Sequence, residues 1–268
     1  MKKIKMLVLI GTLIISIGAM VFFVVALVLD LNTTRQGQAF FEDAALPVFV
    51  APRPDISQVT SAPLASPEAH AEQSPLSHIA VPHIDFDAMR QDFPSIIGWL
   101  QSAGTNINYP LMQGTDNVFY LHHLPDGTRN RMGSIFLDYR HSADFSHGNF
   151  LIYGHNMASG DKFASLRHYA SQAFFDAHSS LLLMTPEQNF LLGVVATYTI
   201  DSTQEHPPSY FIDETHFDSF MADVRRRSPL RSDLAVSYGD QLVFLVTCIY
   251  ADNTSPWRRI VVARLIDI

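Results

Sequence analysis

A run of apolar and small residues from Met6 to Leu29 limits what this chain can fold into more than any other feature. As a helix, with a rise of about 1.5 Å per residue, the run is longer than the roughly 30 Å hydrocarbon core of a bilayer. Three lysines precede the run and Asp30 follows it. The positive-inside rule then predicts a cytoplasmic N-terminus, with the rest of the chain outside the cell.

A cleaved signal peptide is the alternative interpretation of this run. The apolar region would be unusually long for such a peptide, and no convincing small-x-small cleavage site follows it. An uncleaved anchor is therefore favoured. We expect a single-pass protein of the plasma membrane with an extracellular folded part.

The segment after the anchor is predicted to be a spacer. From Leu46 to Val81 it is rich in proline, alanine and serine and shows no sustained apolar period. Proline at this density favours an extended, poorly packed chain. The expected organisation is a cytoplasmic tip and transmembrane anchor over residues 1–30, an extracellular spacer over 31–83 and one folded domain over 84–268.

Composition excludes one class of partner. The chain of 268 residues has a formal net charge of -8 and shows neither a basic stripe nor a glycine-rich phosphate loop, so binding to nucleic acid is not expected. Its 12 histidines do not show the spacing of a metal site. No metal and no cofactor are predicted.

The folded part is predicted to be mainly β, with peripheral helices. A short helix is expected over Ile84–Phe93, ended by Pro94, and further helical segments over 162–168, 170–178 and 214–227. The strands are short and rich in β-branched and aromatic residues, so a closed or nearly closed β-barrel is the simplest arrangement. They are expected over 97–100, 106–112, 133–137, 149–153, 190–200, 241–248 and 259–266.

Cys248, the only cysteine, ends the apolar run Leu242–Thr247. No intrachain disulfide can form, so a thiol outside the cell needs another reason to be there. A nucleophile held at the end of a buried strand is one reason. A small hydrophobic residue buried in the core is the alternative, and spacing alone does not decide between them.

Two further residue types complete a possible catalytic group. His155 lies in a Gly-His-Asn turn after a predicted strand, where an imidazole could exchange protons with the thiol. Arg258 and Arg259 precede the last predicted strand, and a guanidinium can serve a developing oxyanion as a donor and a positive charge. Adjacent strand residues face opposite ways, so at least one arginine must have another role.

Several ordered segments together resemble the sortases, the cysteine transpeptidases of Gram-positive bacterial surfaces. Class B is favoured by the long connection that holds the helix Glu214–Arg227 and by the amphipathic helix before the barrel. The matching segments are Gly98-Trp99-Leu100, Asn106 to Asn117, Tyr120 to His123, Gly133 to Arg140, Ile152 to Met157, Val246 to Cys248 and Arg259 to Leu265.

The resemblance implies an eight-stranded β-barrel and a thiol-dependent acyl transfer. The family's catalytic cysteine and histidine fall on Cys248 and His155, and its arginine on Arg258, with Arg259 as the fallback. The positions expected to contact substrate are Asn108, Tyr153 and Thr247. One departure is Val246, which stands where class B members often carry serine and leaves substrate preference open.

The implied reaction cleaves a C-terminal sorting motif of a surface protein after threonine and joins the acyl group to an amine. That amine belongs either to a peptidoglycan precursor or to a pilin subunit. Two other functions remain open: an exported cysteine peptidase that hydrolyses the same kind of bond, and a catalytically silent, membrane-tethered binding module.

Overall fold

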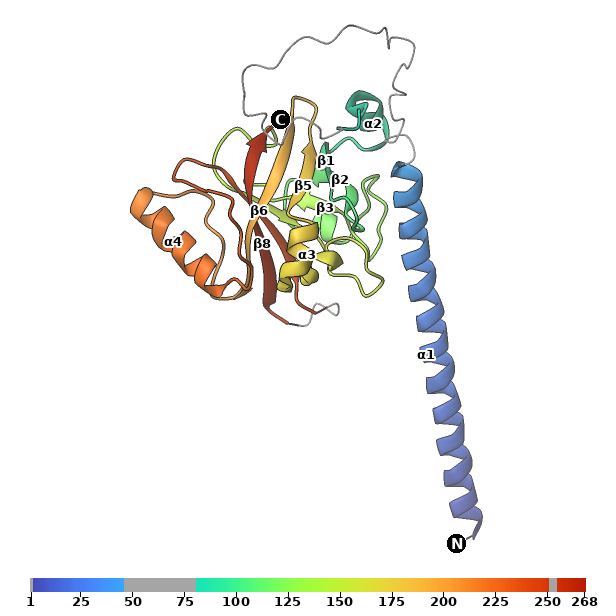
Figure 1. The fold of residues 1–268 in the computed structure, drawn as a ribbon. Coiled ribbons are helices and arrows are strands. Elements are labelled where there is room, and N and C mark those ends of the chain that lie inside the picture. Colours follow the sequence, from blue (N-terminus) through green and yellow to red (C-terminus); the bar gives the residue numbers. More distant parts are fainter. Residues whose placement is uncertain (1, 46–80, 251–254) are drawn as a thin grey trace, which may run out of the picture.

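The computed structural model describes residues 2–45, 81–250 and 255–268 of the chain. Eight strands form a closed barrel in the order β1-β2-β3-β4-β7-β8-β6-β5 (Figure 1). The prediction of a closed, mainly β barrel is therefore confirmed. The strands are β1 Ile96–Gln101, β2 Asn108–Gln113, β3 Ile135–Leu137, β4 Phe150–Tyr153, β5 Ser180–Met184, β6 Asn189–Asp201, β7 Leu242–Cys248 and β8 Trp257–Asp267.

Two parallel pairings interrupt an otherwise antiparallel barrel. β2 pairs with β3 in parallel, and β4 pairs with β7 in parallel, with Tyr153 opposite Val246. Because β4 and β7 run in the same direction, the residues that follow each strand emerge at the same end of the barrel. β8 returns antiparallel to β7, so its first residues reach that end too.

The barrel interior is filled by large apolar side chains. Leu111, Ile152, Leu183, Leu245 and Val261 are fully buried in one cluster. Burying an aliphatic side chain of this size contributes about 1.5–3 kcal/mol relative to leaving it exposed. The packed interior gives the strand ends the rigid support that a catalytic group requires.

Capped helices cover the outside. α2, Phe86–Asp92, begins at Asp85, whose carboxylate accepts from the Ala88 N–H at 2.9 Å. α4, Glu214–Arg227, begins in the same way at Asp213 and packs against β6. The remaining helices of the described residues after 80 are the 3-10 segments η3 Phe119–Leu121 and η4 Ala164–Ala170, and α3 Gln172–Ala177.

Two parts of the fold differ from the sequence-based expectation. β5, Ser180–Met184, was not predicted, because its continuous leucine run lacks the alternation that marks a half-buried strand. The helix predicted over 162–168 is instead the 3-10 segment η4, shifted toward the C-terminus.

The N-terminal helix is longer than predicted. α1 runs without a break from Lys2 to Ala45, so the first 15 residues of the expected spacer over 31–83 are helical. They contain no proline, and the first one downstream is Pro47. The proline-rich residues 46–80 lie outside the described residues. The apolar part of α1 is long enough to cross a membrane, as an anchor or a signal sequence does.

Candidate active site

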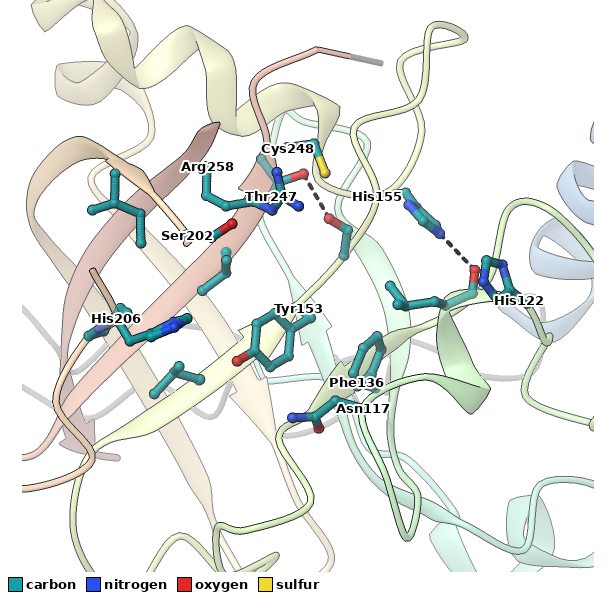
Figure 2. Close-up of a pocket in the computed structure, with 16 residues that line it drawn as sticks. Asn117, His122, Phe136, Tyr153, His155, Ser202, His206, Thr247, Cys248 and Arg258 are labelled. Carbon is teal, nitrogen blue, oxygen red and sulfur yellow. Dashed lines mark hydrogen bonds between the residues drawn. The ribbon is translucent and has the colours of Figure 1, made fainter. Parts of the chain in front are cut away.

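A pocket of about 400 Å³ opens at the end of the barrel where β4 and β7 end and β8 begins. Cys248, His155 and Arg258 all border it, although they come from distant parts of the chain (Figure 2). The other lining residues are Asn117, Leu121, His122, Phe136, Leu151, Tyr153, Gly154, Ile200, Ser202, His206, Pro207, Val246 and Thr247.

Cys248 is the last residue of β7 and is half-buried at the pocket rim. Its main chain is held from the neighbouring loop, because the side-chain amide of Asn156 donates to the Cys248 carbonyl at 3.0 Å and to the Ile249 carbonyl at 2.9 Å. The preceding Thr247 hydroxyl donates to the Gly154 carbonyl at 2.7 Å. The end of β7 is thus bound to the turn that carries His155.

His155 lies two residues beyond β4 and is only 8% exposed. Its Nε2 donates to the Leu121 carbonyl at 2.7 Å, and the opposite edge of the ring faces the Cys248 sulfur (Figure 2). A carbonyl can only accept, so the proton of a neutral ring sits on Nε2, and Nδ1 is the nitrogen that can accept a proton.

The surroundings of His155 favour the neutral imidazole. Burial lowers its pKa below the ordinary value of 6.5, and the nearby positive charge of Arg131 lowers it further. The hydrogen bond to Leu121 raises the pKa and is a smaller effect than burial. A neutral ring at physiological pH is a ready proton acceptor for a thiol.

The two adjacent arginines have different positions. Arg258 is the cross-strand partner of Cys248 and lines the pocket, where its Nη1 donates to the Ser255 carbonyl at 2.6 Å. Directly opposed residues of an antiparallel pair share one face of the sheet. Arg259 pairs with Thr247 instead and does not line this pocket. Burial lowers the pKa of Arg259.

A buried carboxylate organises one wall of the pocket. Asp138 is fully buried and accepts from the Tyr153 hydroxyl at 3.1 Å and from the Asn117 amide at 2.8 Å. Arg140 forms a bidentate ion pair with Asp138, through Nε to Oδ1 at 2.9 Å and Nη2 to Oδ2 at 2.7 Å. Burial by itself would raise the pKa of Asp138, but the hydrogen bonds from Arg140 and Asn117 outweigh it and lower the pKa far below its ordinary value.

The three residues expected to contact substrate do not all lie in this pocket. Tyr153 and Thr247 line it, whereas Asn108 does not. The Asn108 side chain accepts a hydrogen bond from the indole of Trp99 at 2.8 Å and lines a separate hollow beside α1. Asn108 begins β2, on a different part of the barrel surface, and its contact with substrate stays a prediction.

Sequence reasoning missed several residues of the pocket. Asn117 and Phe136 lie within segments that carried the family resemblance, but no pattern assigned them to a wall. His206 and Ser202 follow β6 in the long connection before α4 and give no local signal. Only the closure of the barrel brings these residues together.

Comparison with known proteins identifies the family. No protein-family model matches the chain. The chain is 33% identical over 171 residues to Sortase B of Listeria monocytogenes, an alignment that covers 64% of this chain and 70% of the relative. The chain belongs to the sortase B family.

Solved structures agree with the assignment of this chain to the sortases. The chain matches a Staphylococcus aureus sortase B–substrate complex with a TM-score of 0.64 and 28% identity, over 68% of this chain and 85% of the other. A sortase B complexed with triglycine matches with the same TM-score and identity, over 68% and 86%. The expected assignment to class B is confirmed, and with it the cysteine transpeptidase family.

Proposed function

We propose that Cys248, His155 and Arg258 of this sortase catalyse transpeptidation of a sorting motif. The observation that carries the proposal is their convergence on one pocket, from the end of β7, the turn after β4 and the start of β8. Acyl transfer requires a nucleophile, a proton carrier and a group that stabilises the oxyanion, and the three side chains supply one of each.

In the first step, the Cys248 thiolate attacks the carbonyl carbon of the threonine in the sorting motif. His155, through Nδ1, takes the thiol proton and gives it to the departing amine, so the peptide bond breaks and a thioester forms. The second step is the reverse of the first. An incoming amine attacks the thioester and loses its proton to His155, which returns it to the departing Cys248 thiolate. Arg258 gives up its hydrogen bond to the Ser255 carbonyl and donates instead to the substrate oxyanion.

Tyr153, Thr247 and Val246 line the part of the pocket in which the sorting motif would lie. One matched structure is a sortase B–substrate complex, which supports substrate binding in this fold. The other holds triglycine, which favours the terminal amine of a wall peptide as acceptor. The lysine side chain of a pilin is the second candidate.

The location proposed for the reaction is the outer face of the plasma membrane. α1 would span the bilayer as an uncleaved anchor, with residues 1–30 as tip and anchor and residues 84–268 outside. A sortase tethered in this way meets exported surface proteins as they leave the membrane.

The test is ligation by the full chain in nanodiscs, with a sorting-type peptide offered with and without triglycine. We expect a ligated product only with triglycine and a thioester on Cys248 by mass spectrometry. Cys248→Ala should give neither. Hydrolysis at the same rate with and without triglycine would establish the peptidase alternative. Binding without any cleavage would establish the silent module.

A further inference from the structure

Val246 shares one face of β7 with the candidate nucleophile. Successive side chains of a strand point to opposite faces, so Val246 and Cys248 lie on the same face, and both line the pocket. Two residues of a strand cover about 6.6 Å. A substrate whose threonine carbonyl meets the Cys248 sulfur therefore brings a neighbouring side chain within reach of Val246.

Val246 belongs to an apolar floor of the pocket. It pairs with Tyr153 of β4, and the Tyr153 ring lies against Phe136, with 5.4 Å between the ring centroids. Both rings lie below Cys248 in the view of Figure 2. The members of this apolar floor are Phe136, Leu151, Tyr153, Ile200 and Val246.

Polar atoms beside the apolar floor are already bonded within the protein. The Tyr153 hydroxyl donates to Asp138 at 3.1 Å. The Asn117 amide donates to Asp138 at 2.8 Å and accepts from the Tyr139 N–H at 3.1 Å. The Thr247 hydroxyl donates to a main-chain carbonyl at 2.7 Å. A substrate amide placed over this floor would lose its water without gaining these groups as partners, which is unfavourable.

Two exposed histidines lie at the rim of the pocket. His122 and His206 both line it, on opposite sides of the view in Figure 2, and both are in contact with solvent. Val246, by contrast, is only 6% exposed. The pocket is therefore polar at its rim and apolar in its depth, where the substrate lies nearest the thiol.

The direction of the reaction decides which part of the substrate meets the apolar floor. His155 serves the departing amine, so the residues after the threonine leave on the side of the imidazole. The residues before the threonine stay on the enzyme in the thioester, and the apolar floor is available to them. A serine at position 246 would offer this part of the substrate a hydroxyl, whereas Val246 offers only methyl groups.

We propose that Val246 makes the apolar floor a subsite for a leucine-sized aliphatic side chain, carried by one of the three residues before the threonine of the sorting motif. This subsite rests on the proposed function and specifies the substrate of the same reaction. Asparagine is the decisive competitor, because it resembles leucine in shape and differs in polarity. An aliphatic side chain gains from leaving water, and an amide without partners loses.

The test is a competition between sorting-type peptides that carry either leucine or asparagine at one of these three positions. The full chain in nanodiscs ligates them to triglycine, and mass spectrometry measures the two products. Wild type should favour leucine by about tenfold to a hundredfold at one position. Equal ligation of both peptides at all three positions, or a preference for asparagine, overturns the subsite.

Two variants test the role of Val246. Val246→Thr keeps the β-branched shape and replaces a methyl group by a hydroxyl. It should reduce the preference for leucine to about threefold or less, as should Val246→Ser. Val236→Thr is the matched control, because Val236 packs half-buried on the same cluster and does not line the pocket. An unchanged preference in both Val246 variants, or an equal fall in the control, overturns the role of Val246.

Peptide binding separates this subsite from the proposed function. Cys248→Ala in nanodiscs should bind the leucine peptide more tightly than the asparagine peptide in isothermal titration calorimetry. If wild type ligates neither peptide while this difference in binding is present, the proposed function fails and the subsite stands. If wild type ligates both peptides equally, the subsite fails and the proposed function stands.

Discussion

The side-chain amide of Asn156 donates to the main-chain carbonyl of Cys248 at 3.0 Å, from the position next to His155 in the chain. The same nitrogen reaches the Ile249 carbonyl at 2.9 Å. One side chain therefore fixes the end of β7 to the turn after β4. The link therefore holds the strand end that carries the thiol next to the turn that carries the imidazole.

Asn156→Ala should lower kcat for ligation by about tenfold to a hundredfold, because a nucleophile that is no longer held loses its alignment. The KM for the sorting peptide should change little, since the pocket walls remain. Steady-state kinetics measure both quantities.

A matched control lies near the other end of the same two strands. Asn149 is buried, donates to the Pro208 carbonyl at 3.0 Å and accepts from the Leu242 N–H at 3.1 Å, away from the pocket. Asn149→Ala should lower thermal stability and leave kcat almost unchanged. Equal losses of kcat in both variants would contradict a positioning role for Asn156.

Arg258→Lys and Arg259→Lys form a second matched pair. Lysine keeps the charge and loses the planar fork, so Arg258→Lys should lower kcat by about 10²–10³ if this guanidinium binds the oxyanion. Arg259→Lys should ligate at nearly the wild-type rate, because Arg259 does not line the pocket. The reverse ranking would assign the role to Arg259.

Lys162→Met should stabilise the full chain at pH 7 by about 1–3 kcal/mol, because it removes a buried amine that has no hydrogen-bond partner among the described residues. Burial holds the pKa of Lys162 well below its ordinary value of 10.5. At pH values between the folded pKa and 10.5, the unfolded chain binds a proton that the folded chain does not. The free energy of unfolding of wild type therefore rises with pH toward 10.5 and decreases as pH falls.

The pH dependence provides the second readout for Lys162. The unfolding temperature, measured in detergent, should rise less steeply with pH for Lys162→Met than for wild type. Lys162→Arg, which forces a permanent charge into the same place, should be less stable than either. A methionine variant less stable than wild type would show that the contact of the amine with the Phe41 ring is net favourable.

Asp138→Asn should raise the KM for the sorting peptide with little change in kcat, because Tyr153 and Asn117 lose the carboxylate that orients them. Stability should fall by about 1–3 kcal/mol. The folded pKa lies below the ordinary value of 3.8, so this stabilisation is present above about pH 4 and is lost as pH falls further. Asp144→Asn, an exposed control in the same loop region, should match wild type.

Much of the barrel could be predicted because most strands carry their own signal. The run Leu242–Thr247 and the segment before Gly154 are short, apolar and bounded by turns, and both form the expected strands. Their ends also placed Cys248 and His155 at strand termini, which the structure shows. The long connection with the helix Glu214–Arg227 is present with the predicted bounds.

The rest depends on contacts between distant segments. Asn108 was expected to contact substrate from the family resemblance alone, and its hydrogen bond from Trp99 on the adjacent strand could not be predicted from the sequence. The Asp138 network joins residues of three separate segments, and no local pattern marks a buried carboxylate. α1 was expected to end near Asp30 because apolar content defines a span, whereas helix continuation depends on propensity and on docking.

The parallel pairing of β4 with β7 has a consequence for biogenesis. No hairpin can join two parallel strands, so the thiol and the imidazole, 93 residues apart, meet only when the intervening chain has wound into place. Because His155 precedes Cys248 in the sequence, an incomplete chain carries the imidazole without the thiol, and the two meet only when β7 pairs with β4. The candidate catalytic pair therefore stays incomplete until the last strands of the barrel are in place.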